Sequence, residues 1–102
     1  MKCLIFRPGQ KCGTPAVLNT NQISATVGGA YDICRWGYRN RELMVYTGGK
    51  AAESRGEDAN RFIDGRAVHG TIVIVVDDLT PFMIKSFCAD NLFPRVRVAR
   101  SG

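Results

Sequence analysis

The chain has 102 residues, of which 45% are hydrophobic, and this composition excludes a disordered chain and leaves room for one small folded domain. Fourteen Lys and Arg residues against nine Asp and Glu residues give a net charge of +5, and ten of the fourteen are Arg. A basic balance permits an acidic partner such as nucleic acid, but it determines neither fold nor activity.

The first third of the chain predicts a β-hairpin followed by a short helix. Residues 2–7 form a β-compatible run that a Pro-Gly turn closes, and residues 16–18 form a second run. Residues 19–21 offer N-caps for a short helix, which the two glycines at 28–29 would end by adopting a left-handed backbone conformation.

The middle of the chain predicts a second hairpin and then a loop. Residues 31–36 and residues 43–47 have the composition of strands, and residues 37–41 form the turn between them. Residues 48–58 predict a loop with room for one helical turn around Ala51.

The last third predicts a central strand and a longer helix. Residues 68–76 include five consecutive Ile and Val residues without polar alternation, which indicates a strand covered on both faces. Thr80 followed by Pro81 is typical of a helix start, and Pro94 would end that helix. Residues 95–100 form either a final edge strand or a tail.

Together these elements predict an α+β fold. We expect a mainly antiparallel sheet of about five strands, a short helix in the N-terminal half and a C-terminal helix packed on the sheet. Residues 1–94 are expected to form a single domain, and residues 95–102 a basic C-terminal edge strand or tail.

The short apolar runs and the spacing of the cysteines favour a cytoplasmic location. The longest apolar run, residues 72–76, is far shorter than the roughly 20 residues that cross a bilayer, and the N-terminus lacks the apolar stretch of an export signal. We therefore expect a soluble, cytoplasmic protein. Its cysteines, Cys3, Cys12, Cys34 and Cys88, form no Cys-x-x-Cys pair, so reduced thiols are expected rather than a zinc site or a disulfide scaffold.

Several short motifs follow one another along the chain. They are Phe-Arg-Pro-Gly at residues 6–9, Val-Gly-Gly at 27–29, Gly-Gly-Lys at 48–50, Asn60 with Arg61, Gly65, Gly-Thr-Ile-Val-Ile-Val at 70–75, and Asp-Leu-Thr at 78–80 before an amphipathic helix. Their order resembles the domain-of-unknown-function family numbered 3846 over nearly the whole chain, apart from the Arg-rich end beyond Pro94. The resemblance implies a setting in phages, plasmids and integrated elements of Gram-positive bacteria. It implies no activity that can be assigned to particular residues.

The residues of these motifs are expected to be mainly structural. The glycines at 28–29 and 48–49 are expected to supply backbone conformations with positive φ, and Gly70 to permit a close approach or a bulge at the entry of the strand. The glycines complete no phosphate-binding loop, although Lys50 could still touch an anion. Asn60 and Arg61 either hydrogen-bond the carbonyl groups of a loop or present a binding group.

Catalysis and metal binding have little support in the sequence. His69 lacks a third group that would orient its ring toward Cys34 or Cys88, and the adjacent Asp77 and Asp78 would point to opposite faces of a strand. We expect the two aspartates to stabilise the start of the following helix instead. The sequence therefore predicts no catalytic residue, no metal site and no cofactor.

The most informative constellation lies at the tip of the second predicted hairpin, and its members are Arg35, Trp36, Tyr38, Arg39 and Arg41. Arginines interleaved with aromatic rings combine phosphate contacts with stacking surfaces, which is the chemistry of single-stranded nucleic-acid or nucleotide binding. The same residue types dominate the hot spots of protein interfaces. A third alternative is that Trp36 packs in the core and the arginines are solvated. All three alternatives stay open at this point.

The charge is divided along the chain, and a second basic segment contains Arg95, Arg97 and Arg100. Residues 1–52 hold seven basic and two acidic residues (+5), residues 53–94 four and seven (−3), and residues 95–102 three and none (+3). An anionic partner should therefore meet the hairpin or the C-terminal arginines, whereas a basic protein surface would dock on the middle segment. The C-terminal arginines alternatively protect a sheet edge from pairing with another sheet.

Two functional hypotheses follow. The first is a non-enzymatic accessory binding protein of a mobile element that acts on a host protein or ribonucleoprotein complex, most concretely an inhibitor of a bacterial defence complex such as a CRISPR effector. The small size, the lack of catalytic residues and the setting that the resemblance implies motivate it. The alternative is a small nucleic-acid- or nucleotide-binding module that uses the Arg and aromatic residues of the hairpin.

Overall fold

The computed structural model describes residues 1–38, 41–63, 66–77, 79–82 and 96–98. The elements in chain order are β1 (Lys2–Phe6), β2 (Thr14–Val17), α1 (Thr20–Thr26), β3 (Asp32–Tyr38), β4 (Arg41–Thr47), α2 (Gly49–Ser54), β5 (Ala59–Ile63), β6 (Arg66–His69), β7 (Ile72–Val75) and β8 (Val96–Val98). The α+β class predicted from the sequence is confirmed.

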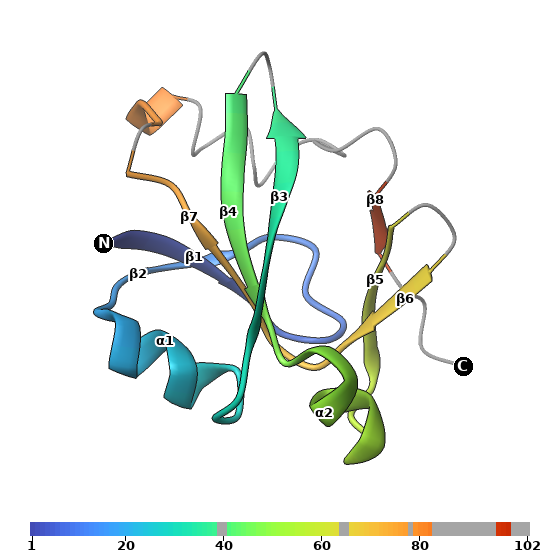
Figure 1. Ribbon diagram of the computed structural model, residues 1–102. Helices are drawn as coiled ribbons and strands as arrows, with labels where there is room; N and C mark the ends of the chain where they lie inside the picture. Colours follow the sequence, from blue (N-terminus) through green and yellow to red (C-terminus); the bar gives the residue numbers. More distant parts are fainter. Residues whose placement is uncertain (39–40, 64–65, 78, 83–95, 99–102) are drawn as a thin grey trace.

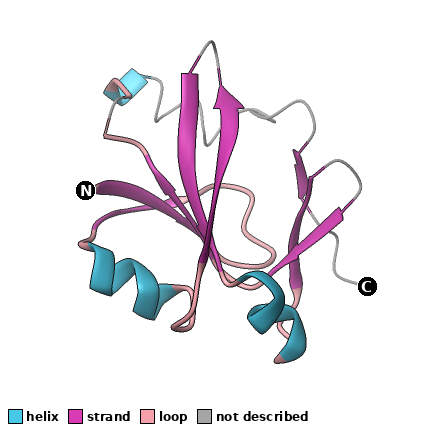
Figure 2. Cartoon of the chain, in the orientation of Figure 1, coloured by secondary structure: helices cyan, strands magenta, loops and turns pink. Residues whose placement is uncertain are grey.

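The larger of two sheets has five antiparallel strands in the order β2-β1-β7-β4-β3 (Figure 1). β7 lies at its centre because its side chains are apolar on both faces: Ile72, Val73 and Ile74 are all buried. The predicted central strand is therefore confirmed for this segment. α1 and α2 lie at the end of the molecule opposite the distal ends of β3 and β4 (Figure 2).

The larger sheet buries side chains on both faces, because successive residues of a strand point to opposite sides. On one side, which we call the helix face, Ile23 and Val27 from the α1 segment pack against Cys3, Ile5, Tyr46 and Val73. On the opposite face a second cluster contains Leu4, Phe6, Trp36, Leu43, Val45, Ile72, Ile74, Val76 and Leu79, and Val68 of β6 packs against it.

α1 begins and ends where local signals predict. The Asn19 side chain accepts a hydrogen bond of 2.8 Å from the backbone N–H of Gln22, and the Gln22 side chain accepts one of 2.8 Å from the N–H of Asn19. After the helix, Gly28 and Gly29 adopt φ values of 98° and 110°. This reciprocal cap and the two glycines confirm the predicted helix.

The apolar run at residues 68–76 is not one strand, and this part of the prediction is wrong. Gly70 adopts a φ of 79° and interrupts it, so that β6 joins a smaller sheet of order β6-β5-β8 while β7 joins the larger sheet. A Cβ at position 70 would lie 3.2 Å from the Ala52 Cβ and 2.9 Å from Glu57 Oε1. Glycine is required here for both the turn and the close approach.

Two connections are more regular than expected. The predicted turn at residues 37–41 is mostly strand, because Gly37 pairs with Glu42 and Tyr38 with Arg41. The predicted loop after β4 contains the six-residue helix α2.

The C-terminal part is described only in places. Pro81 and Phe82 are helical, in line with the predicted helix start, whereas the rest of the predicted helix lies outside the described residues. β8 pairs antiparallel with β5 at the edge of the smaller sheet, so residues 96–98 are an edge strand. No helix in the described ranges is long and apolar enough to cross a membrane.

Candidate functional site

The β3–β4 hairpin extends past its neighbour in the sheet. β3 and β4 pair over seven residues, whereas β7 pairs with β4 only at the three positions Val45, Tyr46 and Thr47. In the distal half of the hairpin, β3 and β4 therefore pair only with each other, and this half projects from the sheet (Figure 1).

Alternation along the two strands divides the hairpin side chains between the faces. Trp36 is directly opposite Leu43, and both belong to the buried cluster of the opposite face. The neighbouring positions point to the helix face beyond the residues that α1 covers. There Ile33 is 51% exposed and Met44 36% exposed, and the side chains of Arg35 and Glu42 are 71% and 67% exposed. We call Ile33, Arg35, Glu42 and Met44 the hairpin surface.

Trp36 occupies the core rather than the surface. It is only 8% exposed, and it packs in the same cluster as Leu43 and Val45. Of the three alternatives that the sequence left open, core packing is the one that the structure shows for Trp36. The Trp36 ring is therefore not a stacking surface for a base.

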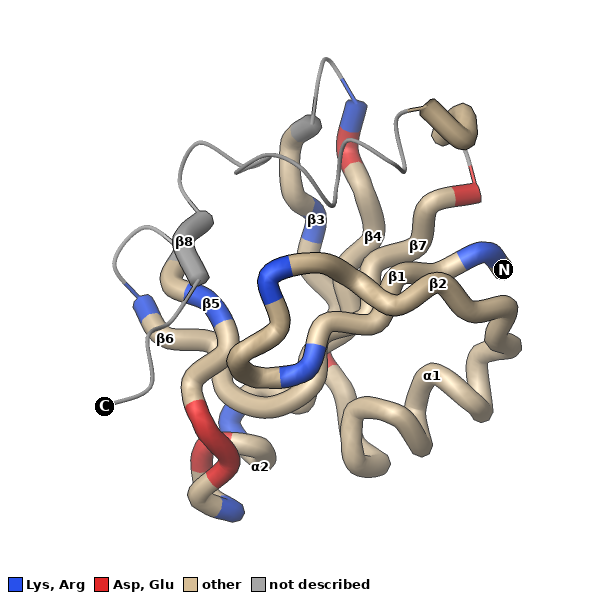
Figure 3. The backbone as a smooth tube through the Cα atoms, turned by 180° about the vertical axis from the view of Figure 1, so that it is seen from behind, with Lys and Arg blue, Asp and Glu red and all other residues tan. Residues whose placement is uncertain are grey.

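The two described arginines of the predicted constellation do not form one patch. Arg35 is paired with Met44 and lies on the helix face, whereas Arg41 is paired with Tyr38 and lies on the other face. Arg35 Nη1 lies 3.7 Å from Glu42 Oε2, an exposed contact that contributes little. Figure 3 shows basic positions distributed over β3, β4 and the β1–β2 loop, and acidic positions close to α2.

The remaining predicted site residues are described in part or not at all. Arg97 belongs to β8 and pairs with Phe62 of β5, but its side chain is outside the described part of the structure. The same holds for the side chain of Tyr38 and for the whole of Arg39, Arg95 and Arg100.

Asn60 and Arg61 form a buried polar link rather than a binding group. Asn60 Nδ2 donates to the carbonyl oxygens of Phe6 (2.6 Å) and Gly70 (2.8 Å), which joins β1 to the turn before β7. Arg61 Nη2 donates to the carbonyl of Gln10 (2.7 Å) and Nη1 to Asn60 Oδ1 (2.7 Å). The sequence-based alternative of a loop organised through its carbonyl groups is therefore the one that the geometry supports.

A β-bulge explains why two consecutive side chains are both buried. The register of β5 against β6 shifts between Ala59 and Arg61, so Asn60 and Arg61 do not alternate between faces. Arg61 is 7% exposed, its guanidinium lies 5.1 Å from the centre of the Phe6 ring, and no carboxylate of the described residues lies within ion-pair distance. Burial lowers the pKa of Arg61 from its usual value.

The titratable side chains of His69 and Asp77 each contact a backbone group. His69 Nδ1 lies 2.9 Å from the carbonyl oxygen of Glu57, and Asp77 Oδ1 accepts a hydrogen bond of 2.7 Å from the backbone N–H of Lys2. Within the described ranges no three His, Cys, Asp or Glu side chains are grouped so as to hold a metal ion. Burial raises the pKa of the Cys3 thiol, which makes its reactive thiolate scarcer.

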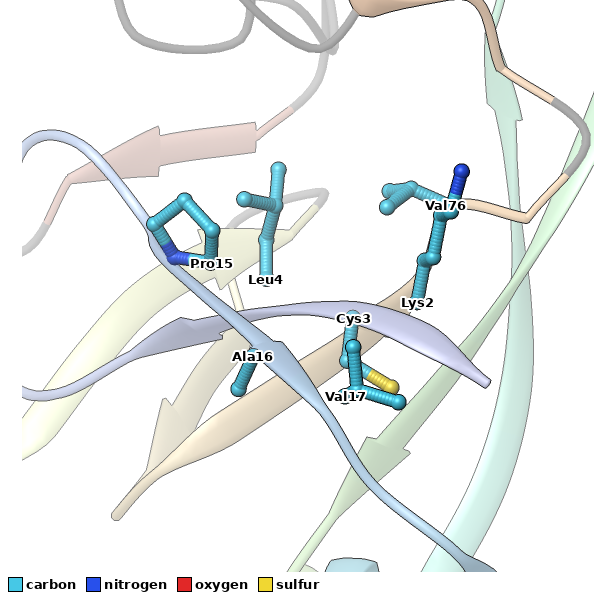
Figure 4. A pocket seen from close by; sticks show the side chains of 7 residues that line it. All are labelled: Lys2, Cys3, Leu4, Pro15, Ala16, Val17 and Val76. Carbon is cyan, nitrogen blue, oxygen red and sulfur yellow. The ribbon is translucent and has the colours of Figure 1, made fainter.

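A small open pocket of about 320 Å³ lies over β1 and β2. Leu4, Pro15 and Val76 form its apolar wall, and the Lys2 side chain rises beside Val76 (Figure 4). His69 is not among its lining residues, so this pocket does not bring together the histidine and thiol that a nucleophilic enzyme would need.

Comparisons of the chain with protein-family models, with curated proteins and with solved structures give no significant match.

Proposed function

We propose that the chain is a non-enzymatic binding protein that recognises another protein through the hairpin surface. The observation that carries this proposal is a run of exposed side chains on one face of the hairpin: Ile33 at its base, and Arg35, Met44 and Glu42 on the part that extends past β7. Single exposed apolar residues are common on protein surfaces, but Ile33 and Met44 lie on adjacent strands of one face. Apolar residues next to Arg and other charged groups are typical of the centre and rim of protein interfaces.

Two features favour a protein partner over a nucleic acid. Binding of single strands needs exposed rings on which bases stack, and Trp36, the one ring of the predicted constellation whose side chain the structure describes, is buried. It also needs cations along one groove, and Arg35 and Arg41 lie on opposite faces of the hairpin.

The most concrete form of the proposal is an accessory protein of a mobile element that acts on a host protein or ribonucleoprotein, such as an inhibitor of a CRISPR effector. Its support is the order of short motifs from residues 6–9 to residues 78–80, which resembles a family of phages and plasmids of Gram-positive bacteria. The hairpin surface would then act by occupying a functional surface of the host complex.

Affinity capture with matched variants tests the proposal. The immobilised protein is incubated with a lysate of a Gram-positive bacterium, beside Ile33→Glu and the control Val17→Glu, which changes an exposed valine on the opposite sheet edge. We expect a stoichiometric protein that the wild type and Val17→Glu capture and Ile33→Glu loses, because a buried charge disrupts an apolar contact. Capture that is equal for all three, or no captured protein, would contradict the proposal.

The nucleic-acid alternative has a separate test. Fluorescence anisotropy with labelled single-stranded DNA and RNA at low and high salt measures the affinity and shows whether it depends on phosphate contacts, which salt weakens. Salt-sensitive binding that Arg41→Glu removes would support the alternative. We expect no such binding.

A further inference from the structure

The outer edge of β3 is the longer and less protected edge of the large sheet. β3 is the last strand in the order β2-β1-β7-β4-β3, and all seven of its residues pair with β4 on one side. No strand of the described residues pairs with the other side, whose backbone N–H and C=O groups therefore resemble a template for a further strand. The opposite edge, β2, has four residues and includes Pro15, which has no N–H to donate.

The exposed side chains along this edge determine which kind of strand can pair with β3. Ile33 and Arg35 are two residues apart on the helix face, and both are exposed. Arg35 contacts Glu42 only at 3.7 Å and in solvent. Glu42 lies on β4, one strand spacing of about 4.8 Å further from the edge, so an added strand meets the Arg35 charge first.

A second copy of the chain is disfavoured as the added strand. Arg35 is the middle residue of Asp32–Tyr38, so full antiparallel overlap of two β3 strands would place Arg35 directly opposite Arg35. Like charges opposite each other destabilise a strand pair. A carboxylate at the same position would instead be stabilised.

We propose that an extended, acidic segment of the partner protein adds to the edge of β3 and continues the large sheet. Backbone hydrogen bonds to β3 supply affinity, an apolar side chain of the segment covers Ile33, and an Asp or Glu two residues away lies opposite Arg35. This inference rests on the proposed function and specifies its partner: the recognised segment has an apolar residue and an acidic residue separated by one position.

Nuclear magnetic resonance of the isotope-labelled full chain with short synthetic peptides tests this inference. The probe is a peptide of alternating Thr and Val in which one central Val is replaced by Glu. A second peptide has Lys in place of the Glu, and a third carries N-methyl groups on alternate amides, which block backbone pairing. We expect the Glu peptide at millimolar concentration to shift and protect the β3 amides, the Lys peptide to bind about tenfold more weakly, and the N-methylated peptide not to bind.

A charge exchange makes the test specific for Arg35. Because Arg35 is exposed, Arg35→Glu should keep the fold and prefer the Lys peptide over the Glu peptide by about tenfold. The inference is overturned if the Glu peptide leaves the β3 amides unchanged, if the N-methylated peptide binds equally, or if Arg35→Glu keeps the wild-type preference. Protection of β3 that grows with protein concentration and needs no peptide would also overturn it, in favour of self-pairing.

Hydrogen exchange in a captured complex separates this inference from the proposed function. If Ile33→Glu abolishes capture while the partner leaves exchange of the β3 amides unchanged, the hairpin surface binds a protein without strand addition. If no protein is captured, the proposed function fails, and a positive peptide result shows only that the β3 edge accepts an acidic strand.

Discussion

The buried Asn60 side chain connects two parts of the chain that are far apart in sequence. It is fully buried, and its amide nitrogen serves two carbonyl oxygens, one at the end of β1 and one at Gly70. Its amide oxygen accepts from Arg61, which in turn holds the β1–β2 loop through Gln10. One side chain thus donates to two buried backbone carbonyl groups and accepts from a buried guanidinium.

Truncation of this side chain should be costly. We expect Asn60→Ala to lower the free energy of unfolding by about 2–4 kcal/mol, because it removes two buried hydrogen bonds to carbonyl groups and the acceptor of a bond from Arg61. The same substitution at the exposed Asn21 should change it by less than about 0.5 kcal/mol. Urea denaturation of the two variants measures the difference, and equal losses would show that the Asn60 hydrogen bonds do not stabilise the fold.

The buried thiol of Cys3 should make stability sensitive to alkaline pH. Burial raises the pKa of Cys3 above 9.0, so the unfolded chain loses this proton at a lower pH than the folded chain. The thiol's contribution is complete below about pH 9 and is lost as the pH rises toward the folded-state pKa.

Unfolding free energies under reducing conditions at about pH 8 and pH 10 test this linkage. The decrease between the two should be smaller for Cys3→Ala than for the wild type, because the variant lacks the titrating group. Decreases of equal size in the two proteins would refute the linkage.

At the scale of elements, Gly70 determines that one apolar run becomes two strands in two sheets. Its φ of 79° turns the chain, and the space beside it is occupied by Ala52 and Glu57. Gly56 offers a comparison, since its φ is 75° and nothing lies within 4 Å of a Cβ built on it.

The two glycines separate backbone strain from steric contact. Gly56→Ala should cost about 1–2 kcal/mol of unfolding free energy from the left-handed conformation alone. Gly70→Ala should cost measurably more, because the Ala52 Cβ would lie 3.2 Å from the new methyl group. Thermal denaturation of both variants checks the order, and a smaller loss at Gly70 would contradict it.

The sequence predicts the elements that depend on neighbouring residues. The caps of α1 lie within one turn of the helix they bound, and the position of β7 at the centre follows from its own run of Ile and Val. The sequence predicts a close approach or bulge at Gly70, and the contact distances to Ala52 and Glu57 confirm the close approach. The division of the run between two sheets, however, depends on residues that meet only after the chain has folded.

The sequence predicts the β3–β4 hairpin but not which face each of its side chains occupies. The β3–β4 pairing extends to Tyr38 and Arg41, and this register places Arg35 and Arg41 on different faces and Trp36 opposite Leu43. The sequence predicts a turn over residues 37–41, and a turn of that length does not determine on which face the side chains of the two strands lie. Ile33 and Met44 carry no distinguishing sequence signal, because an exposed apolar residue on a strand has the same pattern as a buried one.

At the scale of the molecule, the described basic positions are spread over several elements and do not gather on one of them. The basic segment at residues 1–52 contributes positions to several elements, and one of its arginines lies beside Glu42 on the hairpin. A general attraction of anions is therefore a weaker account of the molecule than recognition through one projecting hairpin. The central claim is that the hairpin surface binds a protein.

The most direct test of that claim is the dissociation constant of the purified captured protein for the wild type, Ile33→Glu, Met44→Glu and Val17→Glu, together with their unfolding free energies. We predict that both hairpin variants bind at least about thirtyfold more weakly while remaining folded, as for the loss of an interface hot spot. Val17→Glu should bind as the wild type does. Wild-type affinity in both folded hairpin variants would contradict the account.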